Sequence, residues 1–238
     1  MTDLNKEKSA IDSARRCQRN WDLTRKVPEE HIDHWTYLAT HAPSKQDESF
    51  FDLYVVTDRE KIDFLVREHS WGFTAVDGKD WVVRNTQMGA NAMFIFNRKM
   101  NEDEVRNFDK FGERRDPNAT SRWDNAYTAI GIASGIIAFS ANNMGYKTGY
   151  GKNFGYKEMP KMSHDVWCEV LGVPEGEQRL TYSLGIGYPD EDLEWFQSKD
   201  NNEYLTGGPV LWEQKELPGN YSYLPYSRLE RTIKVFKV

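Results

Sequence analysis

Three arginines near the N-terminus are the first residues whose types and spacing suit a chemical task. Arg15, Arg16 and Arg19 stand together in the segment SARRCQR. Guanidinium groups bind phosphate through paired hydrogen bonds, so this cluster suits an anion site. The alternative interpretation is the solvated face of a helix, where arginines are common. The segment alone leaves both interpretations open.

A second candidate is the glycine-rich stretch after Met144. Its glycines are separated by aromatic residues: Gly145, Gly149, Gly151 and Gly155, with Tyr146, Tyr150 and Phe154 between them. Glycine lets a backbone come close to a ligand, and aromatic rings form walls around flat molecules. The stretch therefore predicts a loop that contacts a flat ligand.

A long helix must position this loop. Apolar or small residues fill nearly every place from Asn125 to Met144, and Gly145 supplies a left-handed stop. This pattern predicts a helix buried on all sides, too short and too sharply flanked by polar residues to span a bilayer. A stripe of small residues runs along it: Gly131, Ser134, Gly135 and Ala138. Such a stripe suits either tight core packing or a subunit interface.

Other chemical motifs are missing from the sequence. His31 and His34 lie one helical turn apart, but no third metal ligand is evident, so we expect surface histidines and no metal site. The sequence has no Walker loop, no GxSxG motif and no GxGxxG motif after a strand. No nucleophile with a partnered base stands out. If the protein is an enzyme, we expect a cofactor to carry the chemistry.

Composition restricts the class of protein. The 238 residues include 31 Lys and Arg against 37 Asp and Glu, and this net charge of −6 argues against a general nucleic-acid binder. Apolar residues make up 39% of the chain, enough for the core of one domain. Cys17 and Cys168 form no CxxC pair, which fits a reducing cytoplasm. With no apolar signal-peptide segment at the N-terminus, we expect a cytoplasmic protein that binds neither nucleic acid nor membranes.

The rest of the chain gives local helix and strand signals. We expect helices that begin near Pro28, Asp58, Asn101 and Ser163, and strands over residues 50–56, 92–96 and 179–186. Residues 71–73 and 190–219 are predicted to be loops, and residues 112–123 a mobile lid. The β-rich tail must pair with an existing sheet edge.

Six segments, in this order, resemble the nitroreductase family of FMN-dependent oxidoreductases. They are RRCQR, APS at 42–44, the glycine-studded central helix, LGVPEG at 171–176, LGIGYP at 184–189 and PYSRL at 225–229. The resemblance spans roughly residues 13–229. It implies that residues 1–238 are a single nitroreductase-like FMN-binding domain, with 190–219 as an insertion or loop region.

The resemblance implies an α+β fold in which helices flank a mainly antiparallel central sheet. It also implies an intertwined homodimer that shares two FMN sites at the subunit interface. The small-residue helix would be a dimer element, and the tail 230–238 would pair with the partner's sheet.

Positions that match the family's motifs imply the cofactor site. The phosphate and ribityl side would be formed by Arg15, Arg16, Cys17 and Arg228. The pyrimidine edge would be contacted by Arg19, which would tune the redox potential, and by Asn85 or Gln87. Pro43 and Ser44 would come from the other subunit, and the backbone of Gly149, Gly151 and Lys152 would face flavin N5. The family commonly has Ser at position 17, and a thiol is a weaker donor, so phosphate binding would depend more on the arginines.

The resemblance also implies a ping-pong reaction. NAD(P)H would deliver a hydride to flavin N5, and an electron-poor acceptor such as a nitroaromatic or a quinone would then take its place. Residues expected to line the open face are Phe111, Arg114, Arg115, Arg122, Trp123 and Phe154, for which solvent-facing loop positions are the alternative. Two other functions stay open: a different reaction on the same fold, such as reductive dehalogenation, dehydrogenation or flavin fragmentation, and a non-catalytic flavin-binding protein.

Overall fold

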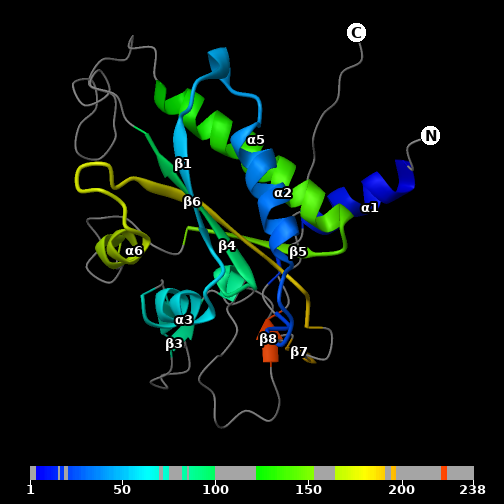
Figure 1. Cartoon of the computed structure of the whole chain (residues 1–238). Helices are drawn as coiled ribbons and strands as arrows, with labels where there is room; N and C mark the ends of the chain where they lie inside the picture. The colour runs from blue at the N-terminus through cyan, green and yellow to red at the C-terminus, as the bar shows by residue number, and fades with distance from the viewer. Residues whose placement is uncertain are drawn as a thin grey trace.

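The fold is built on a four-stranded antiparallel sheet with the strand order β1-β4-β6-β5 (Figure 1). These strands are β1 (Phe51–Val56), β4 (Ala92–Arg98), β5 (Lys147–Gly151) and β6 (Leu180–Gly187). The computed structural model describes residues 4–15, 17–18, 21–69, 72–74, 82–84, 86–99, 122–152, 164–190, 194–196 and 221–223. The three strands that the sequence predicts correspond to β1, β4 and β6, and the mainly antiparallel sheet is confirmed.

Strand β4 lies at the centre of the sheet, and all its residues are buried. Phe94 and Phe96 belong to one core cluster, whereas Met93 and Ile95 belong to another. Successive side chains of a strand point to opposite faces, so β4 contributes to the core on both faces of the sheet.

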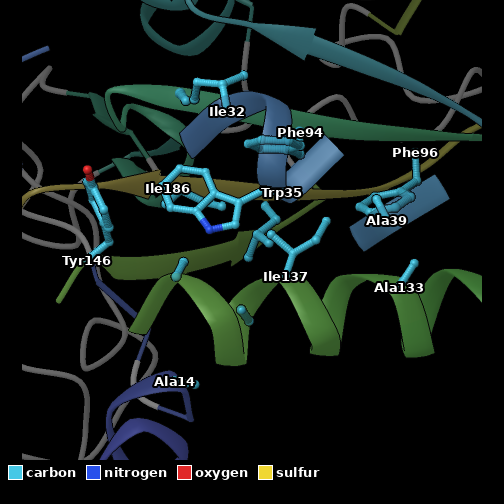
Figure 2. Close-up of a cluster of buried hydrophobic side chains, with 14 of the residues drawn as sticks. Ala14, Ile32, Trp35, Ala39, Phe94, Phe96, Ala133, Ile137, Tyr146 and Ile186 are labelled. Carbon is cyan, nitrogen blue, oxygen red and sulfur yellow. The ribbon is translucent and has the colours of Figure 1, made fainter. Parts of the chain in front are cut away.

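Three helices cover the first face: α1 (Leu4–Ala14), α2 (Glu29–Thr40) and α5 (Arg122–Asn143). Trp35 of α2 is fully buried, and its ring centroid lies 6.3 Å from that of Phe94 and 4.9 Å from that of Tyr146. Figure 2 shows this indole between the sheet and Ile137 of α5. Burial of these large side chains is the main stabilising term on this face.

The second face is covered by α3 (Arg59–Asp63), the π-helical turn η2 (Phe64–Glu68) and α6 (His164–Leu171), which Figure 1 shows on the opposite side of the sheet from α2 and α5. Ile62, Leu65 and Val66 are fully buried, as the sequence pattern predicts. They share a core cluster with Met93 and Trp167. The sheet is therefore the middle layer of a three-layer arrangement.

Local signals fix the ends of several helices as predicted. Pro28 precedes α2, and the Asp58 carboxylate accepts hydrogen bonds from two backbone N–H groups in the first turn of α3. Gly145 and Gly172 follow α5 and α6 with φ angles of +93° and +69°, the left-handed conformation that glycine adopts without strain.

The prediction that the long helix is buried on all sides is wrong for the single chain. Tyr127 and Ile132 of α5 are 40% and 38% exposed. Gly131 and Gly135 are also exposed, and no heavy atom lies within 4 Å of a Cβ placed at either. The other two small residues of the stripe face the core. The helix therefore has one buried face and one apolar face that points outward.

The predicted ligand-contacting loop after Gly145 begins with strand β5 instead. Tyr146, Thr148 and Tyr150 alternate along the chain with Lys147 and Gly149, which is the period of two that a strand requires. The glycines hid this alternation because glycine is unfavourable inside strands. Only Tyr146 therefore lies between Gly145, which ends the helix, and the first residue of β5.

Short elements complete the described chain. The loop expected around residues 71–73 overlaps β2 (Gly72–Thr74), and the region 190–219 contains β7 (Glu194–Phe196). Strand β2 pairs with β3 (Val82–Arg84), and β7 pairs with β8 (Tyr221–Tyr223). Strands of three residues are too short to give a periodic signal. Two 3-10 turns are η1 (Lys45–Asp47) and η3 (Thr86–Met88). Arg122 and Trp123, predicted in the lid, begin α5; the rest of the lid, the helix near Asn101 and the tail lie outside the described residues.

Candidate functional site

The segment from Ser13 to Gln18 runs along the outer edge of β5. The Lys147 ammonium donates to Ser13 Oγ at 2.7 Å, and the Gln18 backbone N–H donates to the Thr148 carbonyl at 2.8 Å. This segment carries two of the predicted phosphate-binding arginines. It therefore joins a cationic part of the sequence to the edge strand of the sheet.

Cys17 makes the next contact along the same edge. The Tyr150 backbone N–H donates to Cys17 Sγ at 3.0 Å, and the thiol donates to the Tyr150 carbonyl at 3.6 Å. The structure thus brings together two parts of the predicted cofactor site, Cys17 and the glycine-rich strand. Both hydrogen bonds join the thiol to the backbone of Tyr150.

Ser13 also joins α1 to α5. Its hydroxyl donates to Asn142 Oδ1 at 2.6 Å, and Asn142 Nδ2 donates to Thr148 Oγ1 at 3.0 Å and to the Ala138 carbonyl at 2.8 Å. Asn142 and Thr148 are buried, so these hydrogen bonds hold the end of α1 against both neighbouring elements.

Gly149 and Gly185 face each other across β5 and β6, and the segment around Gln87 covers them. A Cβ at either glycine would lie closer than 3.0 Å to the Gln87 carbonyl oxygen, and a Cβ at Gly149 would also lie 2.7 Å from the Gln18 carbonyl oxygen. The close approach that requires glycine at 149 is thus to the protein's own backbone. The contact of the Gly149 backbone with a flat ligand stays a prediction.

Four other predicted cofactor residues lie at or near this edge. Gln87 is buried, and its backbone covers the paired glycines. The Gly151 carbonyl accepts a hydrogen bond from Ser183 Oγ at 2.6 Å, and half-buried Lys152 follows directly. The Arg15 side chain is 47% exposed, with its Nε 3.8 Å from Asp12 Oδ1.

Pro43 and Ser44 lie away from the β5 edge. His31, in the first turn of α2, hydrogen-bonds to Tyr146 just before β5, whereas Ser44 follows the other end of this 12-residue helix. At 1.5 Å per residue, the two ends are about 18 Å apart. The Ser44 hydroxyl donates to the Glu48 carbonyl at 2.8 Å, and left-handed φ angles follow at Gln46 and Asp47.

Eight predicted site residues lie outside the described residues: Arg16, Arg19, Asn85, Phe111, Arg114, Arg115, Phe154 and Arg228. Arg122 and Trp123 lie in the first turn of α5, where only the backbone is described.

The prediction of surface histidines needs correction for His31. Its ring is half-buried and bonds to the Tyr146 hydroxyl at 2.7 Å, which in turn lies 3.1 Å from the Tyr188 hydroxyl. Burial raises the pKa of Tyr146, and the hydrogen bond with Tyr188 raises it further. The Arg25 guanidinium lies 3.4 Å above the Tyr188 ring. These contacts make His31 a structural residue at the junction of α2 with the sheet.

One cavity formed by described residues lies away from this edge. It has a volume of about 420 Å³ and is lined by Asp52, Asn97, Arg98, Lys99, Gly176, Glu177 and Arg179. None of the predicted cofactor residues contributes to it. In the described part of the chain, no cluster of three His, Cys, Asp or Glu side chains suits a metal ion. The described helices include none with the length and apolarity needed to cross a membrane.

Sequence reasoning missed Ser13 and Gln18 as organising residues. Gln18 acts through its backbone, so its residue type gives no signal. Ser13 bonds to Lys147 and Asn142, more than 125 positions away, and only the fold brings them together. The alternation of Tyr146, Thr148 and Tyr150 was the available signal for β5.

Comparisons with known proteins assign the chain to a family. The sequence profile of the nitroreductase family matches residues 13–188. The chain belongs to the nitroreductase family. The matched range begins at Ser13 and ends just after β6, so it includes the four strands of the central sheet and the segment that lines β5.

Solved structures with the same fold include three nitroreductase-type proteins. A nitroreductase with bound FMN from Bacteroides fragilis is 17% identical with a TM-score of 0.56, and the match covers 79% of this chain and 90% of that one. An NADPH:FMN oxidoreductase from Vibrio harveyi complexed with NAD+ is 19% identical with a TM-score of 0.53, covering 80% and 71%. An FMN-dependent nitroreductase from Clostridium difficile is 18% identical with a TM-score of 0.51, covering 81% and 93%. No curated protein matches the chain significantly. The family resemblance and the α+β fold are therefore confirmed.

Proposed function

We propose that the protein is an FMN-dependent oxidoreductase that transfers electrons from NAD(P)H to an electron-poor acceptor such as a nitroaromatic or a quinone. Family membership supports this function, as do relatives that bind FMN or act as NADPH:FMN oxidoreductases. The observation that carries the proposal is the attachment of the Ser13–Gln18 segment along β5. It puts cationic residues beside the strand whose backbone the family resemblance assigns to the flavin.

The described residues fit a flavin with one terminal phosphate. The Arg15 side chain is 47% exposed, and Lys147 supplies a second cation on the same edge. Tyr150 and Tyr182 add half-buried aromatic rings whose centroids are 6.2 Å apart. Cations suit the phosphate, and aromatic surface suits a flat ring system.

Each assigned residue has a role toward the cofactor. When bound, FMN supplies a two-electron carrier between the two substrates, which enter in turn. Arg15 holds the phosphate, and the backbone of Gly151 and Lys152 faces the ring. The phosphate side is completed by Arg16 and Arg228, and the pyrimidine edge is contacted by Arg19 and Asn85, as the family resemblance implies. The lid residues line the open face of the flavin.

The proposed assembly is a cytoplasmic homodimer that shares its two cofactor sites. The outward apolar face of α5, with Tyr127, Ile132 and two exposed glycines, suits a second copy of the chain. Ser44 follows the end of α2 that is remote from β5. This position favours a contribution of Pro43 and Ser44 to the partner's site rather than to their own.

A visible absorption spectrum of the purified protein tests the cofactor, and chromatography of the released compound identifies it. We expect a yellow protein that contains FMN and that oxidises NADH or NADPH when a nitroaromatic or a quinone is present. A colourless protein that takes up no added FMN contradicts the proposal. FMN binding without NAD(P)H oxidation favours a non-catalytic flavoprotein.

A matched pair of variants tests the phosphate role of Arg15. Arg15→Ala should weaken FMN binding by about 1.5–3 kcal/mol, the usual net contribution of a charge-assisted hydrogen bond, and should leave riboflavin binding unchanged. Lys8→Ala removes one positive charge from an exposed position of α1, the helix that ends directly before Arg15, so its FMN affinity should match that of the wild type.

A further inference from the structure

We propose that Cys17 is a positioning residue that fixes the cofactor-binding edge of the sheet, rather than a ligand of the cofactor phosphate. The proposal deepens the function given above and rests on it. It also revises the role that the family resemblance implies for position 17, where serine is common.

The contacts of the thiol carry this inference. Its sulfur accepts from the Tyr150 N–H at 3.0 Å, and its proton is directed to the carbonyl of the same residue at 3.6 Å. A thiol has a single proton to donate. Because that proton is directed to a backbone carbonyl, it is not offered to a phosphate oxygen.

The position of Tyr150 explains why such a contact is useful. Strand β5 is at the end of the sheet order, so its outer edge has no neighbouring strand among the described elements. Gln18 pairs with Thr148 through the backbone, and the Cys17 side chain continues this pairing two residues further along β5. The Cys17 side chain thereby bonds to both the N–H and the carbonyl of Tyr150, the two backbone groups that a neighbouring strand would otherwise pair with.

The contact also restricts the place of Arg15. Ser13 and Cys17 are both bound to β5 or its neighbours, and Arg15 lies between them in the chain. Gly151 and Lys152, which the proposed function assigns to the ring, directly follow Tyr150. Cys17 therefore fixes the distance between the groups for the phosphate and the groups for the ring.

Flavin binding distinguishes a positioning residue from a phosphate ligand. In Cys17→Ala, we expect the affinities for FMN and riboflavin to fall by the same factor, about fivefold, as for one net hydrogen bond. Cys17→Ser should restore binding to within about twofold, because a hydroxyl also donates and accepts. Cys168→Ala is the matched control, since this second cysteine is fully buried on the opposite face of the sheet.

Amide hydrogen exchange on cofactor-free protein tests the same contact independently. The Tyr150 amide should exchange about fivefold faster in Cys17→Ala than in the wild type. The Tyr188 amide, which donates to Asn91 Oδ1 at 3.0 Å, serves as the internal control and should not change.

The outcomes separate the two roles. Equal losses for both flavins together with faster Tyr150 exchange support the proposal. A loss restricted to FMN overturns it, and so does unchanged Tyr150 exchange. If the wild type binds neither flavin, the proposed function fails, and the exchange rate of Tyr150 alone then decides whether Cys17 holds this edge.

Discussion

Replacing Gly149 with alanine tests the packing that organises the candidate site. A Cβ there would lie 2.7 Å from the Gln18 carbonyl oxygen and closer than 3.0 Å to the Gln87 carbonyl oxygen. Ordinary contacts begin near 3.4 Å, so the Gln18 carbonyl would have to move by about 0.7 Å. Both obstacles are backbone groups, which cannot rotate away as the end of a side chain can.

The expected cost follows from this geometry. Overpacking of a close-packed interior typically costs about 1–3 kcal/mol. Because two separate backbone segments must shift, we expect Gly149→Ala to lie at the upper end, about 3 kcal/mol. With a urea m-value of about 3 kcal/mol/M, the unfolding midpoint should fall by about 1 M.

Tryptophan fluorescence in urea, on cofactor-free protein at one fixed concentration, measures this change. Gly185→Ala should lose a similar amount, because its Cβ meets the same Gln87 carbonyl from the paired strand. Ser9→Ala, at an exposed position of α1, is the control and should change the free energy of unfolding by no more than about 0.5 kcal/mol. If Gly149→Ala is as stable as this control, the close approach of Gln18 and Gln87 does not exist in the folded protein.

Four further outcomes are expected. Burial raises the pKa of Tyr182, so the stability that this neutral phenol contributes is complete below about pH 10 and is lost as the pH rises further. In urea unfolding above about pH 10, Tyr182→Phe should therefore reduce the fall of the free energy of unfolding with pH by up to about 1.4 kcal/mol per pH unit. Asn97→Asp should cost about 1–3 kcal/mol in thermal or urea unfolding, because the buried amide that donates to the Glu177 carbonyl at 2.9 Å becomes an acceptor. Ile132→Glu should convert the proposed dimer to a monomer in sedimentation, since it charges the exposed face of α5; an unchanged dimer would place the interface elsewhere. Arg19→Gln should lower the two-electron midpoint potential of bound FMN by roughly 20–65 mV, as expected for loss of a nearby positive charge, whereas loss of oxidised FMN with an unchanged potential would assign Arg19 to the phosphate.

The sequence by itself determined the elements whose signals are local. The apolar runs of β4 and β6, the Asp58 cap and the glycines that end α5 and α6 all predicted their structures correctly. Each of these signals depends on residues within one or two turns or within one strand. The order of several weak segments was sufficient to identify the family, because sequence order does not depend on knowing the contacts.

Only the tertiary structure decided the role of the glycine-rich strand. Gly149 is required because Gln18 and Gln87, distant in sequence, pass directly over it, and no local pattern distinguishes this from the approach of a ligand. The burial of α5 was misjudged for a related reason. Its composition is apolar on all sides, but which face meets the sheet depends on where α1 and α2 pack.

The hydrogen-bond partners of Cys17 were also decided only by the tertiary structure. The family resemblance implied a place for Cys17 on the phosphate and ribityl side of the cofactor, and the fold adds hydrogen bonds between its thiol and the backbone of Tyr150. A residue type determines which hydrogen bonds a side chain is able to make. The partner is chosen by the packing of segments more than a hundred residues apart, which no spacing within the chain encodes.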